Sequence, residues 1–373
     1  MNKEFTSLGL MSGTSGDGVD ASIILSDGDT KFEAIKDKYF EYDKEIYQNI
    51  HNLKEKINNI NDLKKFIKEI SILEKEITLF HASVVQEISN EQKIDIVGFH
   101  GQTIYHNPQE KISNQIGDGN LLSQLIKKDV VFNFRQNDIR NGGEGAPLTP
   151  IFHQLIATKY NLELPTCILN IGGISNITII NERTGSYNFT SRDIGPGNCL
   201  IDAWVRKNSK HHYDHKGLIA SRGVRNEIIF EQAQELISNR INKDTLSFDV
   251  NDFDISFVRG LSLEDGATTL TDFTAQIIGT KLVSLLSKEN NKTWRVLLCG
   301  GGRKNETLIN KIKKIAMKNI TFQSLDDYGI NGDFVESQAF AFLAIRSILK
   351  LPLTFPMTTG CKEPSVGGKI VRN

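Results

Sequence analysis

The chain has 373 residues, and its 44 lysines and arginines almost balance its 45 aspartates and glutamates. This length exceeds one ordinary hydrophobic core and predicts two domains. The balanced charge argues against a nucleic-acid partner, and no uncharged apolar run reaches the roughly 18 residues of a membrane-spanning helix. The cysteines form no C-x-x-C pair, so we expect buried free thiols in a cytoplasmic protein without a zinc site.

A polar, glycine-rich turn lies near the beginning of the chain, between two apolar stretches. Apolar residues alternate before it and again over residues 19–25, which predicts a β-hairpin. A Walker A loop would need a lysine and a following helix, and the sequence has neither here. Glycine N–H groups and nearby hydroxyls suit an anion, and Asp17 and Asp20 suit a cation that accompanies it. The residues predict a phosphate-and-metal turn, although an ordinary Gly/Asp-rich β-turn fits the same pattern.

The segment after this hairpin is rich in lysine, glutamate and asparagine up to about residue 93. Apolar residues recur at helical spacing from Leu63 to Ile88, which predicts one long amphipathic helix with a solvated charged face. Residues 94–100 form an apolar run that predicts a buried strand. We expect this strand to end at the polar cluster His100–Thr103, because α/β sheets place ligands beyond the C-terminal ends of their strands.

Two more glycine turns follow. A second hairpin is predicted over residues 166–179 with its turn at Gly172–Asn176, and this repetition predicts a duplicated domain. The third turn is different, because a predicted strand over 295–299 leads into Gly300–Gly302 and a helix begins at Asn305. Bare backbone beside a helix N-terminus lets a flat ring or a phosphate lie close.

The order of two phosphate-type hairpins and a strand–glycine–helix turn resembles the sugar kinase, Hsp70 and actin superfamily. Eight motifs are similar, in order, to those of the anhydro-N-acetylmuramic acid kinase family: Gly9–Asp20, His100–Thr103, Gln115–Asn120, Gly142–Pro147, Asn170–Thr178, Asp193–Asn198, Gly300–Gly302 and Asn331–Ala339. The resemblance implies an α/β fold with two related actin/hexokinase-like domains, built on ribonuclease H-like sheets with flanking helices, around a nucleotide cleft. We expect an N-terminal domain over 1–135, a C-terminal domain over 136–340, and a segment of about 340–373 that packs back onto the first domain.

The resemblance also implies an activity. Members of this family take 1,6-anhydro-N-acetylmuramic acid, a product of peptidoglycan turnover, and with ATP and water give N-acetylmuramic acid 6-phosphate and ADP. The expected partners are therefore a small-molecule sugar, ATP and Mg²⁺, with no nucleic acid and no membrane. A homodimer in the cytoplasm is the state that the resemblance implies.

The nucleotide residues follow from the matching motifs. The resemblance places ATP at the first turn, over Gly13, Thr14, Ser15, Gly16, Asp17, Gly18, Val19 and Asp20. It adds Gly172, Gly173 and Asn176 as the second phosphate turn, with Gly300 and Gly301 as the floor under adenine. Asp20, with Asp17 as a further candidate, would hold Mg²⁺ through water. Gly16 stands where the family usually has leucine, and we expect it to add flexibility without removing a ligand.

Asp193 is the predicted catalytic base. It follows a predicted strand over residues 187–192 and precedes a Gly-Pro-Gly-Asn turn, after which a helix is predicted from Leu200. A helix N-terminus favours an ionised carboxylate that can accept a proton. A role in capping the helix fits the same position. The resemblance decides between them, because the corresponding aspartate of the family is its general base.

The sugar side is assigned through the resemblance to His100, Gln102, Asn198 and Glu336. Imidazole and amide groups can bond sugar hydroxyls and an N-acetyl group, although a lone histidine is more often structural. Arg135 or Arg140 could pair with the lactyl carboxylate of a muramic sugar. Glu336 also fits a purely electrostatic role in the first turn of a helix.

One segment departs from the family pattern. Many members carry Pro-Lys-Ser where this chain has residues 252–259, so the lysine is absent and sugar preference could differ. A sugar-binding repressor would need a preceding helix-turn-helix, and a chaperone a following peptide-binding domain; neither is expected here. An actin-like filament protein would not explain the motifs at 100–103 and 193–198. The enzymatic alternative is a kinase for an ordinary sugar hydroxyl, with Asp193 taking its proton.

Overall fold

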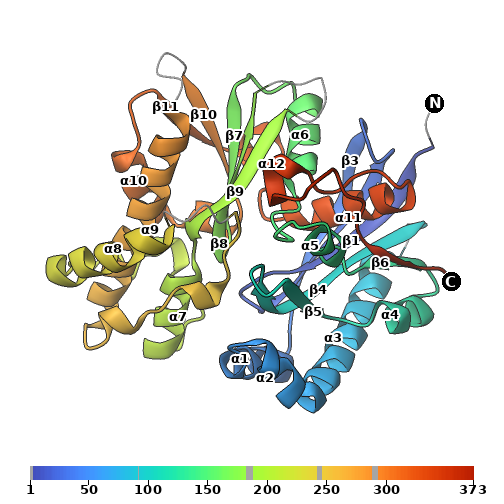
Figure 1. Ribbon diagram of the computed structural model, residues 1–373, viewed down its shortest axis with the longest axis horizontal. Coiled ribbons are helices and arrows are strands. Elements are labelled where there is room, and N and C mark those ends of the chain that lie inside the picture. The colour runs from blue at the N-terminus through green and yellow to red at the C-terminus, as the bar shows by residue number, and fades with distance from the viewer. Residues whose placement is uncertain (1–2, 91, 182–187, 242–245, 288–292) are drawn as a thin grey trace. The chain divides into compact units, whose positions relative to one another are not determined.

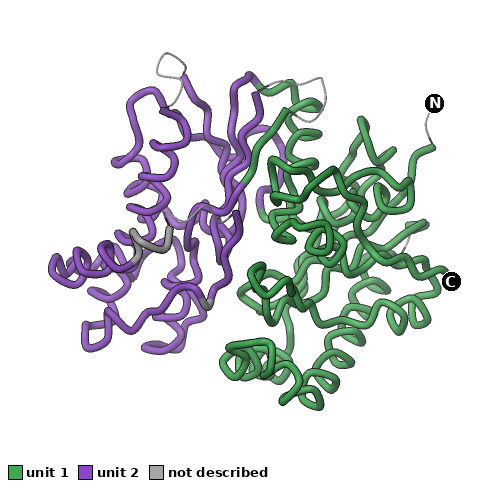
Figure 2. Tube along the Cα trace, in the orientation of Figure 1, with its two compact units in different colours: residues 1–162, 182–191, 333–373 green, residues 163–181, 192–332 purple. Residues whose placement is uncertain are grey.

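The computed structural model describes residues 3–90, 92–181, 188–241, 246–287 and 293–373 (Figure 1). The chain divides into two compact units (Figure 2). Unit 1 comprises residues 1–162, 182–191 and 333–373, and unit 2 comprises residues 163–181 and 192–332. In the part of the chain that the structure describes, no helix is long and apolar enough to cross a membrane.

Unit 1 is built on a mixed sheet in which the strand order is β12-β6-β4-β1-β2-β3, with β5 paired to β4. The strands are β1 (Phe5–Ser12), β2 (Gly18–Ser26), β3 (Phe32–Glu41), β4 (Ile96–Asn107), β5 (Ile112–Ile116), β6 (Asp129–Phe132) and β12 (Lys369–Val371). β1, β2 and β3 form an antiparallel meander, and β4 and β6 run parallel to β1. The predicted first hairpin is therefore confirmed.

Helices cover both faces of this sheet. They are α1 (Lys44–Lys56), α2 (Ile60–Lys65), α3 (Ile67–Ile88), α4 (Gly119–Ile126), α5 (Gln136–Arg140), α6 (Pro150–Lys159), α11 (Val335–Ile348) and α12 (Pro356–Thr359). Side chains alternate along a strand, so Leu8 and Leu10 of β1 join the core cluster that contains α3. Ser7 points the other way and donates to the Ala341 carbonyl of α11 at 2.8 Å. At Gly9 a Cβ would lie 1.9 Å from the Ser337 carbonyl oxygen, so only glycine allows α11 this close.

The prediction of one long helix from residue 63 to 88 is wrong at its beginning, because the structure has two helices there, α2 and α3. α2 begins with a capping box between Asn59 and Asp62, and it ends at Phe66, whose φ and ψ are −101° and 20°. Leu63 before the break and Ile70 after it enter the same core cluster. The apolar spacing continues across the break, which is why periodicity alone predicted one helix.

The strand predicted at residues 94–100 is longer than expected and does not end at the polar cluster. β4 continues through His100–Thr103, because β5 pairs with it antiparallel from Gln102 to Asn107. The register against β1 shifts beside this point, and Gly101 takes a φ of 75°. The cluster therefore lies inside a strand, at an irregularity that re-aims its side chains.

Unit 2 contains a second sheet in the order β11-β10-β7-β8-β9. Its strands are β7 (Thr166–Ile171), β8 (Ile174–Ile180), β9 (Phe189–Pro196), β10 (Trp294–Cys299) and β11 (Ile320–Ser324). Its helices are α7 (Cys199–Asn208), α8 (Glu227–Ile241), α9 (Leu263–Leu286) and α10 (Glu306–Ile315), with short 3₁₀ turns at His215–Gly217, Val250–Asp252, Ser256–Val258, Gly301–Lys304 and Leu325–Tyr328. β7 and β8 are antiparallel, which confirms the second predicted hairpin, and β10 and β11 run parallel to β7.

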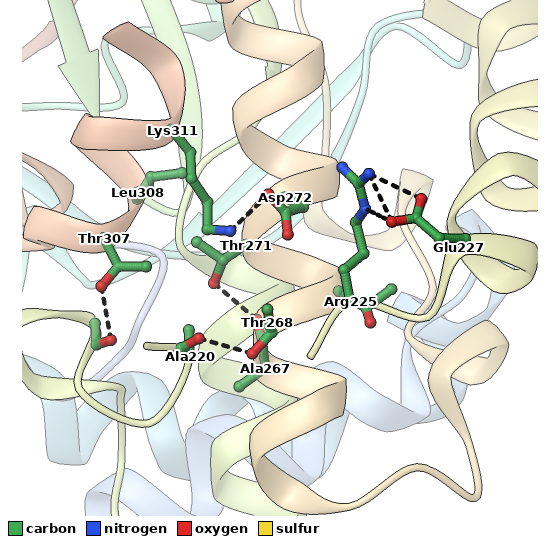
Figure 3. A network of polar contacts seen from close by, with 12 residues as sticks. Ala220, Arg225, Glu227, Ala267, Thr268, Thr271, Asp272, Thr307, Leu308 and Lys311 are labelled. Carbon is green, nitrogen blue, oxygen red and sulfur yellow. Dashed lines mark hydrogen bonds and ion pairs between the residues drawn. The ribbon is translucent and has the colours of Figure 1, made fainter. Parts of the chain in front are cut away.

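Polar contacts tie helix α9 to its neighbours in unit 2 (Figure 3). Thr268 donates to the Ala220 carbonyl at 2.7 Å, and Lys311 of α10 donates to Asp272 at the same distance. The buried carboxylate of Asp214 accepts the N–H groups of Ile219 and Ala220 at 2.7 and 2.9 Å. These contacts hold the loop at residues 214–220, which follows α7, against α9. The loop therefore has a structural role.

The two sheets share one topology. The orders β3-β2-β1-β4-β6 and β9-β8-β7-β10-β11 are equivalent, so each unit repeats the ribonuclease H-like arrangement and the predicted fold class is confirmed. Unit 1 continues past residue 135 to residue 162 and regains the chain at residue 333. Phe152 of α6 explains this extension, because its ring lies 4.9 Å from Phe32 and 5.6 Å from Phe342 of α11. The four cysteines are free and buried, as expected.

Candidate functional site

The turn of the first hairpin is closed by its own backbone. Gly16 N–H donates to the Gly13 carbonyl at 3.1 Å, and the Ser15 hydroxyl donates to Asp17 at 2.6 Å. The Tyr42 N–H then fixes the Asp17 carbonyl at 2.9 Å. A Cβ at Gly13 would meet only the Ser15 hydroxyl, at 3.8 Å, so the backbone there is open to a ligand.

Helix α1 packs directly on this turn. Gly16 has a φ of +62°, and a Cβ there would lie 2.9 Å from Cγ2 of the fully buried Ile50. Gly16 therefore has a packing role that the sequence did not indicate, since its conformation and the close approach of α1 both favour glycine. From the last turn of α1, Lys54 Nζ donates to the Thr14 carbonyl at 2.8 Å. Sequence reasoning missed this cation, because nothing in the hairpin motif points to a helix 40 residues later.

Asp20 lies in β2, opposite Met11 of β1, and is half-buried. Among the described residues, no group of three or more His, Cys, Asp or Glu side chains could hold a metal ion. Mg²⁺ typically keeps several waters and takes one or two carboxylates together with substrate phosphates. The Asp20 carboxylate, beside the turn predicted to bind phosphate, suits this mode of Mg²⁺ binding and does not by itself make a fully protein-ligated metal site.

His100 is buried and both of its ring nitrogens are engaged. Nδ1 donates to the Gly101 carbonyl at 2.8 Å, and Nε2 accepts from the Arg135 guanidinium at 3.0 Å. Burial, and then the Arg135 cation, hold the pKa of His100 well below its usual range, so the ring is neutral. A neutral ring is the form that can accept from arginine. His100 therefore orients Arg135, and through it the predicted sugar edge.

Arg135 also reaches the glycine loop at residues 142–147, where its Nη1 donates to the Gly145 carbonyl at 2.9 Å. Asp138 joins the same loop to the C-terminal segment. Its carboxylate accepts from the Gly145 N–H and from the Thr359 hydroxyl, both at 2.7 Å. Arg140 is exposed at the end of α5. Arg135 and Arg140 are the two candidates for pairing with the lactyl carboxylate. Of the two, Arg135 is hydrogen-bonded to the predicted sugar residue His100 and to the glycine loop.

Gln102 is fully buried and hydrogen-bonded to the first hairpin turn. Its amide oxygen accepts from the Ser12 hydroxyl at 2.6 Å, and its amide nitrogen donates to the carbonyls of Gly13 and Thr103 at 3.0 and 3.2 Å. The structure thus brings this residue of the second motif to the predicted nucleotide turn.

In unit 2, the Asp193–Asn198 motif is joined to the second glycine turn. Gly197 N–H donates to the Gly173 carbonyl and Asn198 N–H to the Gly172 carbonyl, both at 2.8 Å. A Cβ at Gly197 would lie 2.2 Å from the Gly172 oxygen, which excludes any larger residue. The first N–H of α7, that of Cys199, also donates to the Gly173 carbonyl, at 3.2 Å.

Asp193 sits within β9 rather than after it, and it is 8% exposed. The predicted strand end at residue 192 is therefore wrong, while Tyr187 lies outside the described residues. Asp193 Oδ2 accepts from Phe248 N–H at 2.8 Å, and its own N–H donates to the Leu246 carbonyl at 2.8 Å. α7 begins after Asn198, which makes no side-chain cap bond. These partners hold Asp193 within β9, five residues before Asn198, which is the N-cap residue of α7.

The second turn itself carries one unsatisfied group. The amide oxygen of Asn176 is buried and has no hydrogen-bond partner among the described residues. A Cβ at Gly172 would meet only the Ile174 carbonyl, at 3.5 Å. An open glycine beside an orphaned acceptor leaves room for a polar ligand whose N–H or O–H group would satisfy that oxygen.

The third turn lies against the second one. A Cβ at Gly300 would fall 2.3 Å from Asn170 Oδ1, and one at Gly302 would fall 2.2 Å from Ile171 Cγ2, so both glycines are needed for packing. Gly301 differs, because a Cβ there would meet nothing within 4 Å. Arg303 anchors the turn through a two-bond ion pair with Asp326, at 2.6 and 3.0 Å. This leaves open backbone at the middle glycine.

The family model of anhydro-N-acetylmuramic acid kinase matches residues 5–373 of this chain. The chain belongs to the anhydro-N-acetylmuramic acid kinase family. It is 55% identical over 375 residues to the anhydro-N-acetylmuramic acid kinase of Pelagibacter ubique (strain HTCC1062), covering 100% of each chain. It is 36% identical to that of Agrobacterium fabrum (strain C58 / ATCC 33970), again over 100% of each. Among solved structures, an activator of the 2-hydroxyisocaproyl-CoA dehydratase from Clostridium difficile aligns with a TM-score of 0.42 and 11% identity, over 92% of this chain and 96% of that chain.

The family predicted from the eight motifs is thus confirmed, and the protein is an ATP-using kinase. The segment that departs from the family pattern has a packing role in this member. Phe253 lies 5.7 Å from Phe248, Phe257 lies 5.2 Å from Phe273, and Val258 is fully buried. Apolar side chains there fill the cluster under α7 and α9.

Glu336 lies in the first turn of α11 in unit 1 and is half-buried. Its two neighbours fix the helix on the sheet. The Ser337 hydroxyl lies 2.7 Å from that of Ser22, and the Gln338 amide donates to both oxygens of Asp37 at 3.1 and 3.0 Å. The kinase motif at 331–339 therefore combines anchoring residues with the acidic group assigned to the sugar.

Proposed function

We propose that this kinase opens the anhydro bridge of 1,6-anhydro-N-acetylmuramic acid and phosphorylates O6 in one site, giving N-acetylmuramic acid 6-phosphate and ADP in peptidoglycan recycling. The observation that carries the proposal is the hydrogen-bonded junction of the Asp193–Asn198 motif with the second glycine turn. It joins the motif that carries the Asp193 carboxylate to a turn that we assign to phosphate. The family match over residues 5–373 supports the choice of sugar.

The chemistry asks for a base. O6 is an ether oxygen without a proton, and it becomes a nucleophile only as its bond to C1 breaks. Water attacks C1 and loses its proton to the Asp193 carboxylate, while the C1–O6 electron pair moves to O6. O6 forms a bond to the γ-phosphorus, and the bond from that phosphorus to the bridging oxygen of ADP breaks. Phe248 N–H, which donates to Asp193 Oδ2, favours the ionised carboxylate that this task requires.

Phosphoryl transfer otherwise depends on positioning and charge neutralisation. We assign the phosphates to the open glycines of the two hairpins, Gly13 and Gly172, with hydroxyl and amide help from Thr14 and Asn176. We assign the adenine to the bare backbone at Gly301. In unit 1, Asp20 would hold Mg²⁺ through water, and the ion would neutralise phosphate charge when bound. His100, Arg135 and Glu336 are assigned to the sugar side, with Asn198 on the Asp193 motif.

Isotope tracing tests the proposal. Purified protein, MgATP and 1,6-anhydro-N-acetylmuramic acid are incubated in ¹⁸O-labelled water, and the product is analysed by mass spectrometry and phosphorus NMR. We expect ¹⁸O at C1 of a 6-phosphorylated sugar. ADP formation no greater than the sugar-free background would overturn the proposal. Phosphorylation of an ordinary sugar at one of its hydroxyls, without label at C1, would instead favour direct deprotonation of that hydroxyl by Asp193.

A cytoplasmic location and a homodimer stay predictions. Sedimentation velocity would check the homodimer.

A further inference from the structure

We propose that Gln102 is a positioning residue for the nucleotide turn and not a ligand of the sugar. The proposal rests on the proposed function in one respect, namely that the turn at residues 13–20 binds ATP. It reverses the role that the resemblance implies for this side chain. The evidence is the set of partners that its amide group makes inside unit 1.

Every donor of the Gln102 amide is used within the protein. Its nitrogen donates to the carbonyls of Gly13 and Thr103, and its oxygen accepts from Ser12. The side chain is 0% exposed. A sugar hydroxyl could accept from this amide only by displacing one of its two N–H contacts, and an unpaired buried carbonyl left behind is costly. The burial of the side chain also keeps a donating hydroxyl away from its oxygen.

The contacts also fix which way the amide points. With the amide reversed, its oxygen would face the carbonyl oxygens of Gly13 and Thr103, so two acceptors would oppose one another. Gly13 is the first residue of the turn, and its carbonyl also accepts the N–H that closes the turn from Gly16. Gln102 therefore fixes the Gly13 carbonyl, which is also the acceptor of the hydrogen bond that closes the turn.

A second layer supports this bond. The Ser12 hydroxyl lies 2.6 Å from Gln102 and 3.0 Å from the Gly18 carbonyl, at the far side of the turn. Tyr42, which is buried, donates to the Ser12 oxygen at 3.0 Å. Burial raises the pKa of Tyr42, so its hydroxyl keeps the proton that it donates. The network joins both strands of the hairpin to β4.

Positioning matters here because phosphoryl transfer loses rate steeply when the reacting groups are misplaced. Gln102 follows His100 by two residues on β4, and residues two apart share one face of a regular strand. Here the irregularity at Gly101 interrupts the alternation, so the two side chains meet different partners. His100 directs Arg135, and Gln102 directs the nucleotide turn. One irregular strand thus serves both substrates, with Gly101 and its φ of 75° at the change of direction.

The test separates a nucleotide role from a sugar role. Gln102→Glu keeps size and the acceptor for Ser12 but replaces the two N–H donors by an oxygen facing two carbonyls. We expect KM for ATP, and Kd for a non-hydrolysable ATP analogue measured without sugar, to rise roughly tenfold or more. KM for the sugar should change less than threefold. Gln124→Glu, on an exposed position of α4, is the matched control and should leave all three values unchanged.

Tyr42→Phe gives an independent reading if Gln102→Glu folds poorly, because it removes one outer hydrogen bond and no buried volume. Kd for the nucleotide analogue should rise by a smaller factor in the same direction. Hydrogen exchange of a peptide covering residues 10–20 should quicken in both variants. A rise in KM for the sugar alone, or unchanged nucleotide affinity in both, would overturn the proposal. Failure of the proposed function looks different, since the wild-type protein would then bind the analogue without turning over the sugar.

Discussion

The Asp193 carboxylate accepts a hydrogen bond from the backbone N–H of Phe248, at 2.8 Å. Asp193→Asn keeps an oxygen for this bond, so we expect the fold to persist. The amide has no negative charge to take a proton from water, and kcat should fall by roughly 10²–10⁴. Kd for an ATP analogue should stay within a factor of three. Steady-state kinetics and titration calorimetry measure the two quantities.

Asp214→Asn is the matched control for this prediction. Asp214 is also a buried carboxylate of unit 2, but its two oxygens accept backbone N–H groups from Ile219 and Ala220 in a loop tied to α9. We expect this variant to melt at a lower temperature and to retain kcat per folded enzyme within tenfold. Near-normal turnover of Asp193→Asn would return Asp193 to a structural role.

Much of this arrangement was predictable, because it depends on local patterns. Alternating apolar residues predicted the two hairpins, and the glycine triplet after a strand predicted the third turn. The equivalence of the two sheets followed from the repetition. What the sequence lacked was long-range geometry. The contact of Lys54 with Thr14 joins a helix to a turn 40 residues away, and nothing in either segment specifies the other.

The role of Gln102 was also not predictable from the sequence, because it depends on contacts between distant segments. Its motif was recognised correctly, yet the role of the side chain depended on which atoms its amide faces. Strand β4 was expected to end before this residue, and β5 extends it instead. Gln102 lies in this paired region and is fully buried, and its amide is satisfied by protein atoms rather than by a ligand.

The second prediction concerns the contact between Gly16 and Ile50. Gly16→Ala should lower the free energy of unfolding by about 1–2 kcal/mol, because φ is +62° there and because the new Cβ would lie 2.9 Å from Ile50 Cγ2. Ile50→Leu removes that branch methyl at nearly constant volume. Adding it to Gly16→Ala should recover part of the loss, as urea denaturation of the four proteins in a double-mutant cycle would reveal. Strictly additive effects would contradict the contact.

The third prediction is a pH dependence that comes from His81. The ring is fully buried, Nδ1 lies 2.8 Å from the Ile77 carbonyl, and burial lowers the pKa to about 4. The unfolded chain takes up a proton near pH 6.5 and the folded one does not until about pH 4, so stability falls as pH decreases between these values. At pH 5 the loss from this one group is about 2 kcal/mol.

His81→Phe removes the titrating group and keeps an aromatic ring beside Phe99, which lies 4.8 Å away in the native protein. The fall in the free energy of unfolding from pH 7.5 to pH 5 should therefore be smaller in the variant than in the wild type, by about 2 kcal/mol. Guanidinium denaturation at the two pH values gives the comparison. Equal falls in both proteins would mean that His81 is protonated in the folded state.

The last prediction concerns the charge that α1 brings to the nucleotide turn. Lys54 donates to the Thr14 carbonyl, so its ammonium group lies at the turn to which we assign phosphate. Lys54→Gln retains a donor for that carbonyl and loses the charge. Kd for an ATP analogue should rise about threefold to fivefold at low salt and less at high salt, because the ammonium is solvent-exposed and screened.

Two comparisons decide whether charge is the cause. Lys54→Arg should bind like the wild type. Lys56→Gln should too, because Lys56, at the end of α1, pairs with Glu69 of α3 at 2.7 Å. Binding of adenosine, which has no phosphate, should be unchanged in every variant. If Lys54→Gln binds the analogue normally and Lys54→Met does not, the lysine acts by holding the Thr14 carbonyl and its charge is incidental.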